Sequence, residues 1–162
     1  MYHFTKETDD DYWEVEALFD LCFAPGREAL SSYRLRDSRD PVWDLCYVAR
    51  DSDGVLAGAI RFWHVEVAGH TILILGPVAV HPTRQGEGLG GLLMQTSLQQ
   101  AAAQSWDRVM LVGDEPYYRR FGFTKLTDIK MPPPTNPDRV LGLALTKNAW
   151  GGIKGVVTTP NV

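Results

Sequence analysis

The chain has 162 residues, of which 44% are hydrophobic and 22% charged, with a formal net charge of −4. This predicts a single globular domain over residues 1–162, and the acidic balance argues against a nucleic-acid-binding face. No apolar run is long enough to cross a membrane, and the acidic N-terminus lacks the apolar core of a signal peptide. Two cysteines, Cys22 and Cys46, are too few for a disulfide framework and lie in no metal-binding motif. We therefore expect a cytoplasmic protein without a metal, a membrane or a nucleic-acid partner.

The first 36 residues predict a short strand and then helices. Residues 2–6 alternate weakly, and Thr8, with Asp11 three positions later, is typical of a helix start. Apolar side chains then recur at helical spacing, and Pro25 ends this helix. The inward stripe is Val15, Leu18, Phe19 and Cys22. Residues 27–36 predict a second short helix.

Three strands joined by tight turns follow. We expect them at residues 45–50, 55–67 and 71–80, with turns at 51–54 and 68–70. This pattern predicts an antiparallel meander. Gly76 and Pro77 interrupt the last strand, which predicts a β-bulge there.

The pattern then changes to strand, helix and strand. We expect helices at 88–104 and 115–121, strands at 108–112, 124–126 and 140–145, a loop at 131–137 and an edge strand within 151–157. The helix between residues 80 and 108 predicts a parallel crossover. The predicted class is therefore α+β, with a mixed, mostly antiparallel sheet flanked by helices and one parallel βαβ unit.

A glycine-rich loop links the strand at 71–80 to its helix. Its glycines allow close backbone approach, and the first turn of the helix offers free N–H groups to an anion. The run 86–91 also fits the dinucleotide fingerprint, but the preceding meander opposes a doubly wound sheet. No lysine lies between Glu7 and Asp114, which argues against a P-loop. A tight helix-packing turn without ligand stays open, although so many glycines are costly for packing alone.

The spacing Gln85-x-x-Gly88-x-Gly90 resembles the signature of the GNAT N-acetyltransferase superfamily. The resemblance implies the GNAT fold, with acetyl-CoA as cosubstrate and its pyrophosphate in the loop. It also implies that the bulged strand binds the pantetheine arm and that an N–H near Val78 stabilises the thioester oxyanion. The implied cofactor-binding residues are Val78, Ala79, Val80, Gln85, Gly86, Glu87, Gly88, Leu89, Gly90 and Gly91.

A second motif supports the first. Tyr118-x-x-x-Gly122-Phe123 resembles the family's motif B, in which the tyrosine protonates the leaving thiolate. We expect Tyr117 to pack elsewhere on the helix. Leu111 stands where many members carry asparagine, which departs from the pattern. Four cationic residues suit the 3′-phosphate of CoA, although each is equally explained as a solvated surface charge. They are Arg84, Arg119, Arg120 and Lys125.

An amine acceptor is protonated at pH 7, so a general base is expected. Glu66 is our first candidate, and His64 shares its strand face. His81 and Asp114 are further candidates, and for each of these four residues an exposed strand-end or capping role is favoured over catalysis. Aromatic residues that suit an acceptor pocket or the core are Tyr33, Trp43 and Trp63.

Together these features predict an N-acetyltransferase that moves acetyl from acetyl-CoA to a primary amine by direct attack in a ternary complex. The acceptor, a small molecule or a peptide, is not specified by the sequence, and a homodimer is left open. A non-catalytic acyl-CoA-binding sensor is the alternative, and a nucleotide-binding protein of another class is a second.

Overall fold

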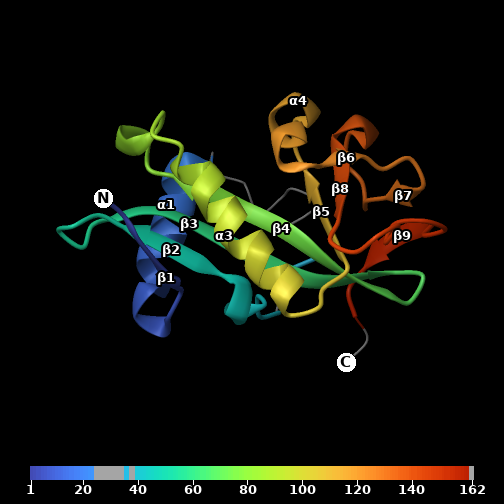
Figure 1. Cartoon of the computed structure of the whole chain (residues 1–162), viewed down its shortest axis with the longest axis horizontal. Helices are drawn as coiled ribbons and strands as arrows, with labels where there is room; N and C mark the ends of the chain where they lie inside the picture. Colours follow the sequence, from blue (N-terminus) through green and yellow to red (C-terminus); the bar gives the residue numbers. More distant parts are fainter. Residues whose placement is uncertain (24–34, 37–38, 161–162) are drawn as a thin grey trace.

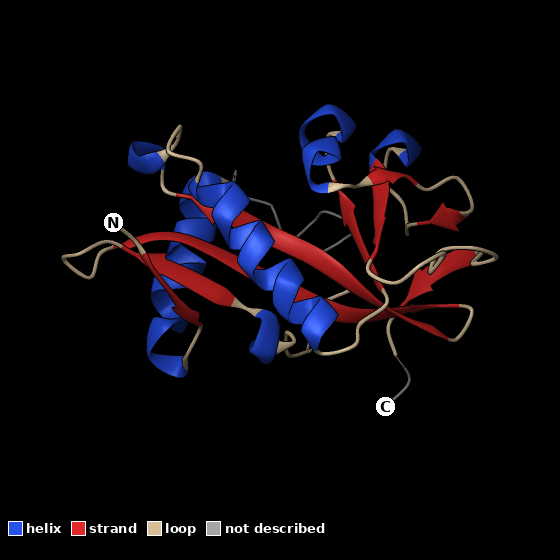
Figure 2. Cartoon of the chain, in the orientation of Figure 1, coloured by secondary structure: helices blue, strands red, loops and turns tan. Residues whose placement is uncertain are grey.

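The computed structural model describes residues 1–23, 35–36 and 39–160, and is built on one twisted sheet with helices on both faces (Figures 1 and 2). Its strands are β1 (His3–Lys6), β2 (Tyr47–Arg50), β3 (Leu56–Val67), β4 (His70–Val80), β5 (Arg108–Val112), β6 (Thr124–Lys125), β7 (Ile129–Lys130), β8 (Val140–Ala144) and β9 (Gly155–Thr158). The α-helices of the described residues are α1 (Tyr12–Cys22), α3 (Leu89–Ala103) and α4 (Glu115–Tyr118). Short 3-10 turns are η1 (Asp9–Asp11), η3 (Trp43–Leu45), η4 (Pro82–Arg84), η5 (Arg119–Phe121) and η6 (Pro137–Arg139).

The strand order is β1-β2-β3-β4-β5-β8-β6, with β9 pairing with both β3 and β7. Strands β1 to β4 are antiparallel neighbours, as are β5 and β8, whereas β4 and β5 run parallel around α3. The predicted meander, crossover and α+β class are therefore confirmed. The β7–β9 pairing was not predicted, because two-residue strands carry no readable periodicity.

Helices α3 and α1 cover opposite faces of the meander (Figure 1). Leu89 and Leu93 of α3 pack on Ile60 and Phe62 of β3. On the other face, residues of the predicted α1 stripe pack on Val48, Ala59 and Ala79. The core therefore fixes β3 and β4 from both sides. Most of the helix expected at 27–36 lies outside the described residues, which include only Leu35 and Arg36 of that segment. Tyr33 also lies outside them.

Strands β4 and β5 part soon after they meet. Their parallel pairing is limited to Leu73 with Val109 and Ile74 with Met110. Immediately beyond, β4 bulges against β3, since Ile60 pairs with Val78 but Phe62 pairs with Leu75. One extra residue at Gly76–Pro77 produces this shift and confirms the predicted bulge. The indole N–H of Trp63 donates to the Gly76 carbonyl at 2.9 Å, which holds the bulged backbone in place.

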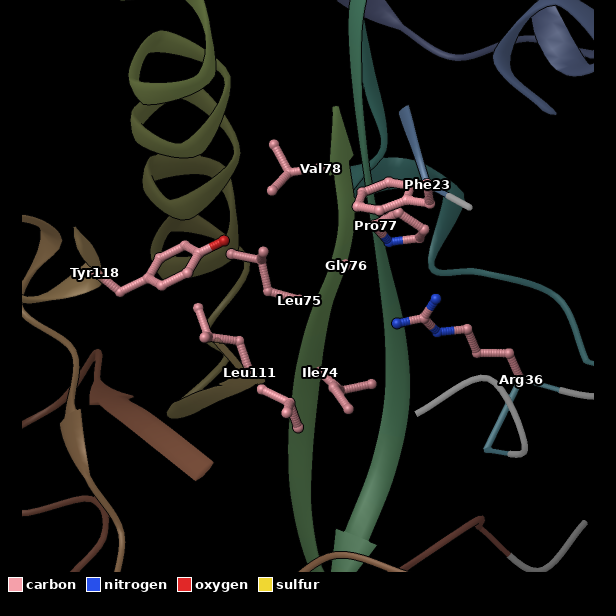
Figure 3. A pocket seen from close by; sticks show the side chains of 10 residues that line it. Phe23, Arg36, Ile74, Leu75, Gly76, Pro77, Val78, Leu111 and Tyr118 are labelled. Atoms are coloured by element: carbon pink, nitrogen blue, oxygen red, sulfur yellow. The ribbon is translucent and has the colours of Figure 1, made fainter. Parts of the chain in front are cut away.

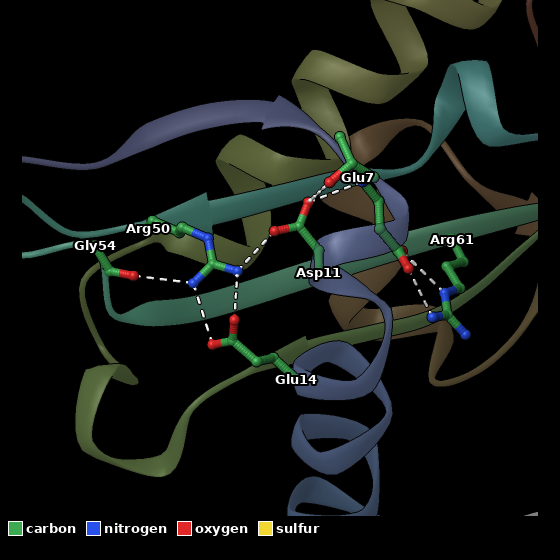
Figure 4. Close-up of polar contacts among 7 residues, drawn as sticks. Glu7, Asp11, Glu14, Arg50, Gly54 and Arg61 are labelled. Carbon is green, nitrogen blue, oxygen red and sulfur yellow. Dashed lines mark hydrogen bonds and ion pairs between the residues drawn. The ribbon is translucent and has the colours of Figure 1, made fainter.

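A buried ion network ties the N-terminal segment to β3 (Figure 4). Arg61 donates to both carboxylate oxygens of Glu7, at 3.0 and 2.8 Å, and to Glu16 at 2.5 Å. Burial raises the pKa of Glu7 despite the opposing effect of Arg61. Nearby, Arg50 bridges Asp11 and Glu14. These contacts fix the start of α1 against the meander.

Candidate active site

A hollow opens where β4 and β5 part, and we call it the strand hollow (Figure 3). Its volume is about 140 Å³. The described residues that line it are Phe23, Arg36, Ile74, Leu75, Gly76, Pro77, Val78, Leu111, Val112 and Tyr118. Tyr118 points toward β4 from one side, and the Arg36 guanidinium points toward it from the other (Figure 3). Side chains from both sides of β4 thus line the hollow.

A larger, adjoining hollow of about 510 Å³ lies over the glycine-rich loop, and we call it the loop hollow. The described residues that line it are Val78, Val80, Arg84, Gln85, Gly86, Gly88, Leu89, Gly90, Gly91, Met94, Tyr117, Tyr118 and Arg120. Val78 and Tyr118 belong to both linings. The two hollows therefore meet at these two residues.

The loop hollow ends at the first turn of α3. Gly88 caps the helix at φ +76°, and Gly86 also has a positive φ of +88°. A Cβ at either position would meet no atom within 4 Å, so the space above them is open. The first N–H groups of a helix have no partner within it and carry the positive end of its dipole. This 15-residue helix therefore presents an anion-binding end to the hollow.

Main-chain groups of β4 also face the loop hollow. The His81 N–H donates to the Ala57 carbonyl, so this position is hydrogen-bonded to β3. Because antiparallel ladders alternate, the N–H and C=O groups of Val78 and Val80 point away from β3, toward the side where β5 has diverged. The Val80 carbonyl accepts from the Gln85 side chain at 3.4 Å, as this direction requires. The edge of β4 thus offers backbone partners to an extended ligand.

Aromatic side chains of α4 and η5 close the hollow. The Tyr117 hydroxyl lies 3.7 Å from the position that a Cβ on Gly90 would take, and the ring of Phe121 lies 3.5 Å from that of Gly91. Arg120 stacks on the Tyr117 ring at 4.5 Å. Tyr117 and Tyr118 point in different directions, as expected: Tyr118 faces β4, while Tyr117 faces the loop and also lines the loop hollow.

Tyr118 occupies the junction of the two hollows. Burial is the largest cause that raises the pKa of its hydroxyl, and the neighbouring Tyr117 and Asp114 act in the same direction. The phenol consequently stays protonated at neutral pH and is able to donate a proton. Gly113 leaves room for its ring, because a Cβ there would lie 2.5 Å from it.

Eight of the ten residues expected to bind the cofactor line the loop hollow. The side chain of Ala79 instead lies in the core beneath α1. The Glu87 carboxylate accepts from the Tyr2 hydroxyl at 2.9 Å. Neither residue is part of the lining of the loop hollow. Met94, one turn after Gly90, was missed, although its helical spacing from the loop was a usable signal.

The candidate bases lie away from the junction. Glu66 pairs with Thr71 and Thr158, four residues along β3 from Phe62, a separation of about 13 Å. Our expectation that Glu66 is the base is corrected accordingly, because the register places it at the far end of the hairpin. His64 contacts Trp106, and burial lowers its pKa.

Two further candidates have other roles. His81 accepts from the Thr83 N–H as a cap of η4, and Asp114 lies 3.5 Å from Arg139 in an ion pair. Trp43, for which the sequence left an acceptor pocket or the core open, lies against Arg61 and lines neither hollow. No acid or histidine is found among the described residues that line either hollow.

The Acetyltransferase (GNAT) domain family matches residues 43–125, which include the meander, the loop and both tyrosines. The chain belongs to the GNAT acetyltransferase family. It is 29% identical over 147 residues to the uncharacterized N-acetyltransferase YhbS of Escherichia coli K12, covering 88% of this chain and 87% of YhbS. It is 31% identical over 127 residues to YjhQ of the same organism, covering 75% of this chain and 68% of YjhQ.

Solved structures agree. The E. coli YhbS structure in complex with CoA superposes with a TM-score of 0.84 at 26% identity, covering 98% of this chain and 89% of that one. A GNAT acetyltransferase from Brucella melitensis in complex with acetyl-CoA superposes with a TM-score of 0.73 at 28% identity, covering 99% of this chain and 96% of that one. These matches confirm the GNAT fold that the sequence motifs implied.

The described residues contain neither a candidate membrane span nor a candidate metal cluster. No helix there is long and apolar enough to cross a membrane. No group of three or more histidine, cysteine or acidic side chains there is arranged to hold a metal ion. Cys22 and Cys46 are free thiols, as expected.

Proposed function

We propose that the chain acts as a single-domain N-acetyltransferase, which transfers acetyl from acetyl-CoA to a primary amine by direct attack in a ternary complex. The observation that carries this proposal is the meeting of the two hollows at Val78 and Tyr118. A cofactor held along the loop hollow has its thioester end at this junction, and an amine reaches it through the strand hollow. The CoA and acetyl-CoA bound to two related structures support this choice of cosubstrate.

In this account the diphosphate lies on the first turn of α3, at Gly86–Gly91, where backbone N–H groups and the helix dipole complement its charge. The pantetheine arm runs along Val78–Val80 and uses the outward main-chain groups of β4. The N–H of Val78 donates to the thioester oxygen as negative charge develops there. In both places the cofactor comes close to the protein backbone, which explains the glycines of the loop and the bulge of β4.

The amine nitrogen attacks the thioester carbonyl and forms a C–N bond. The C–S bond then breaks, and its electron pair stays on the sulfur. Tyr118 gives its proton to this thiolate, and the surplus proton of the new amide leaves to solvent, from which the tyrosine is reprotonated. Because no described lining residue is a base, the amine enters in its neutral form.

Replacing Tyr118 by phenylalanine tests the catalytic part of this proposal. The variant should bind acetyl-CoA with unchanged affinity by calorimetry, while kcat in a thiol-release assay across a panel of amines falls about 100-fold or more. Tyr12→Phe removes a hydroxyl from a residue of α1 that lines neither hollow, and should leave kcat unchanged. An acetyl-CoA-binding wild type that acetylates no amine would instead favour the sensor interpretation.

A further inference from the structure

The acceptor side of the strand hollow carries a single charged side chain among the described residues that line it, and that residue is Arg36. We propose that this arginine binds a carboxylate of the acceptor, so that the acceptor is a compact amine of amino-acid type. The inference rests on the proposed function, because it places the acceptor opposite Tyr118. It adds the chemical class of the substrate, which the family membership leaves open.

Two described contacts locate the guanidinium beside the bulge of β4. Its central carbon lies 5.7 Å from the centre of the Trp63 ring, and its Nη2 lies 3.2 Å from the place that a Cβ on Gly76 would occupy. Trp63 is itself held by its hydrogen bond to the Gly76 carbonyl. The cation is therefore fixed against the bulge of β4, and Figure 3 shows it directed toward that strand.

Burial strengthens the case for an anionic ligand. Arg36 is 8% exposed, and its neighbours in the hollow include the apolar side chains of Phe23, Ile74 and Pro77. A cation in such surroundings has lost much of its hydration, so an arriving carboxylate is attracted more strongly than in water. The planar guanidinium also suits a carboxylate, which it is able to bind through two parallel hydrogen bonds.

Distance and volume limit the size of the acceptor. Gly76 and Val78 are two residues apart on β4, with only Pro77 between them. A carboxylate on Arg36 therefore leaves its amine a few bonds away, beside the junction where the thioester lies. The hollow of about 140 Å³ is equivalent to about five liquid waters, which fits a small amino acid.

Matched acceptor pairs test the inference directly. We expect the wild type to prefer glycine, β-alanine or another small amino acid over the corresponding carboxamide by about 30-fold or more in kcat/KM, chiefly through KM. In Arg36→Gln this ratio should fall to near one. Arg36→Lys, which keeps the charge but loses the planar fork, should lie between them. Lys154→Gln, which removes an exposed cation, is the charge control and should keep the wild-type ratio.

A binding measurement separates this inference from the proposed function. The same acids and carboxamides are titrated into protein saturated with coenzyme A, and thermal midpoints confirm that each variant is folded. Tighter binding of acids that depends on Arg36 supports the inference even if no amine is acetylated, a result that would count against the proposed function alone. Equal binding of acids and carboxamides by the wild type, or an acid preference that survives in Arg36→Gln, overturns it.

Discussion

The indole nitrogen of Trp63 lies 2.9 Å from the carbonyl oxygen of Gly76, at the residue where β4 turns out of register with β3. This hydrogen bond joins the interior of the meander to the point where β4 leaves β5. Trp63 lies in the core, one of the two places that the sequence had suggested, and the bond also gives it a role in positioning the strand.

Replacing Trp63 by phenylalanine should therefore affect stability and activity together. The change leaves the buried Gly76 carbonyl without its donor and shortens the side chain, at a cost of about 1–3 kcal/mol in the free energy of unfolding. We expect a lower denaturant midpoint and a reduced kcat/KM. A variant as stable and as active as the wild type would show that the bulge does not depend on this bond.

The buried pair of Glu7 and Arg61 predicts a pH-dependent defect. Arg61→Met leaves the Glu7 carboxylate buried without its cation, which should lower the free energy of unfolding at pH 7 by about 3–5 kcal/mol. Burial already raises the folded-state pKa of Glu7 above its unfolded value. Stability from the protonated carboxyl is therefore present at low pH and lost as pH rises through the folded-state pKa.

The loss in Arg61→Met should accordingly be smaller at pH 5 than at pH 7, as measured by urea unfolding at both values. Adding Glu7→Gln should recover part of the stability at pH 7, because the neutral amide costs less to bury than a carboxylate. A loss that is equal at both pH values would contradict this explanation.

The pH dependence of catalysis should follow the acceptor. Because no acid or histidine lines either hollow among the described residues, kcat/KM should rise with pH toward the pKa of the acceptor amine. The raised pKa of Tyr118 keeps the general acid protonated over the same range, so no falling limb is expected below pH 10. Acceptors with different amine pKa values should give correspondingly displaced profiles. One common ionisation at pH 4–7 for every acceptor would instead reveal a protein base.

Much of the fold was predictable because the residues that determine its turns, its bulge and the start of α3 are neighbours in the sequence. Turn residues at 51–54 and 68–70 fixed the meander, and the glycines after β4 fixed the start of α3 within one residue. The bulge at Gly76–Pro77 followed from two residue types that disrupt a ladder. Such features depend on the backbone preferences of a few neighbouring residues, which a single sequence displays.

The acceptor side was not predictable, because it depends on register and on distant segments. Arg36 lies 40 positions before Gly76 and belongs to no periodic pattern, so nothing in the sequence connects them. Glu66 was a reasonable candidate by chemistry, but the pairing of β3 with β4 carries it to the far end of the hairpin. Tyr117 was expected to pack away from Tyr118, and that it also lines the loop hollow depends on the fold of α4 over α3, which the sequence does not display.

The central claim is that the loop at Gly86–Gly91 binds the diphosphate of acetyl-CoA, and calorimetry on two alanine variants tests it most directly. Gly88 and Gly69 have φ of +76° and +82°, and a Cβ at either would meet nothing within 4 Å. Gly88→Ala and Gly69→Ala should therefore lose similar stability, about 1 kcal/mol each. We predict that the wild type and Gly69→Ala bind acetyl-CoA equally, while Gly88→Ala binds at least about tenfold more weakly, since the methyl group enters the loop hollow. Equal affinity in all three proteins, or no binding by the wild type, would contradict the account.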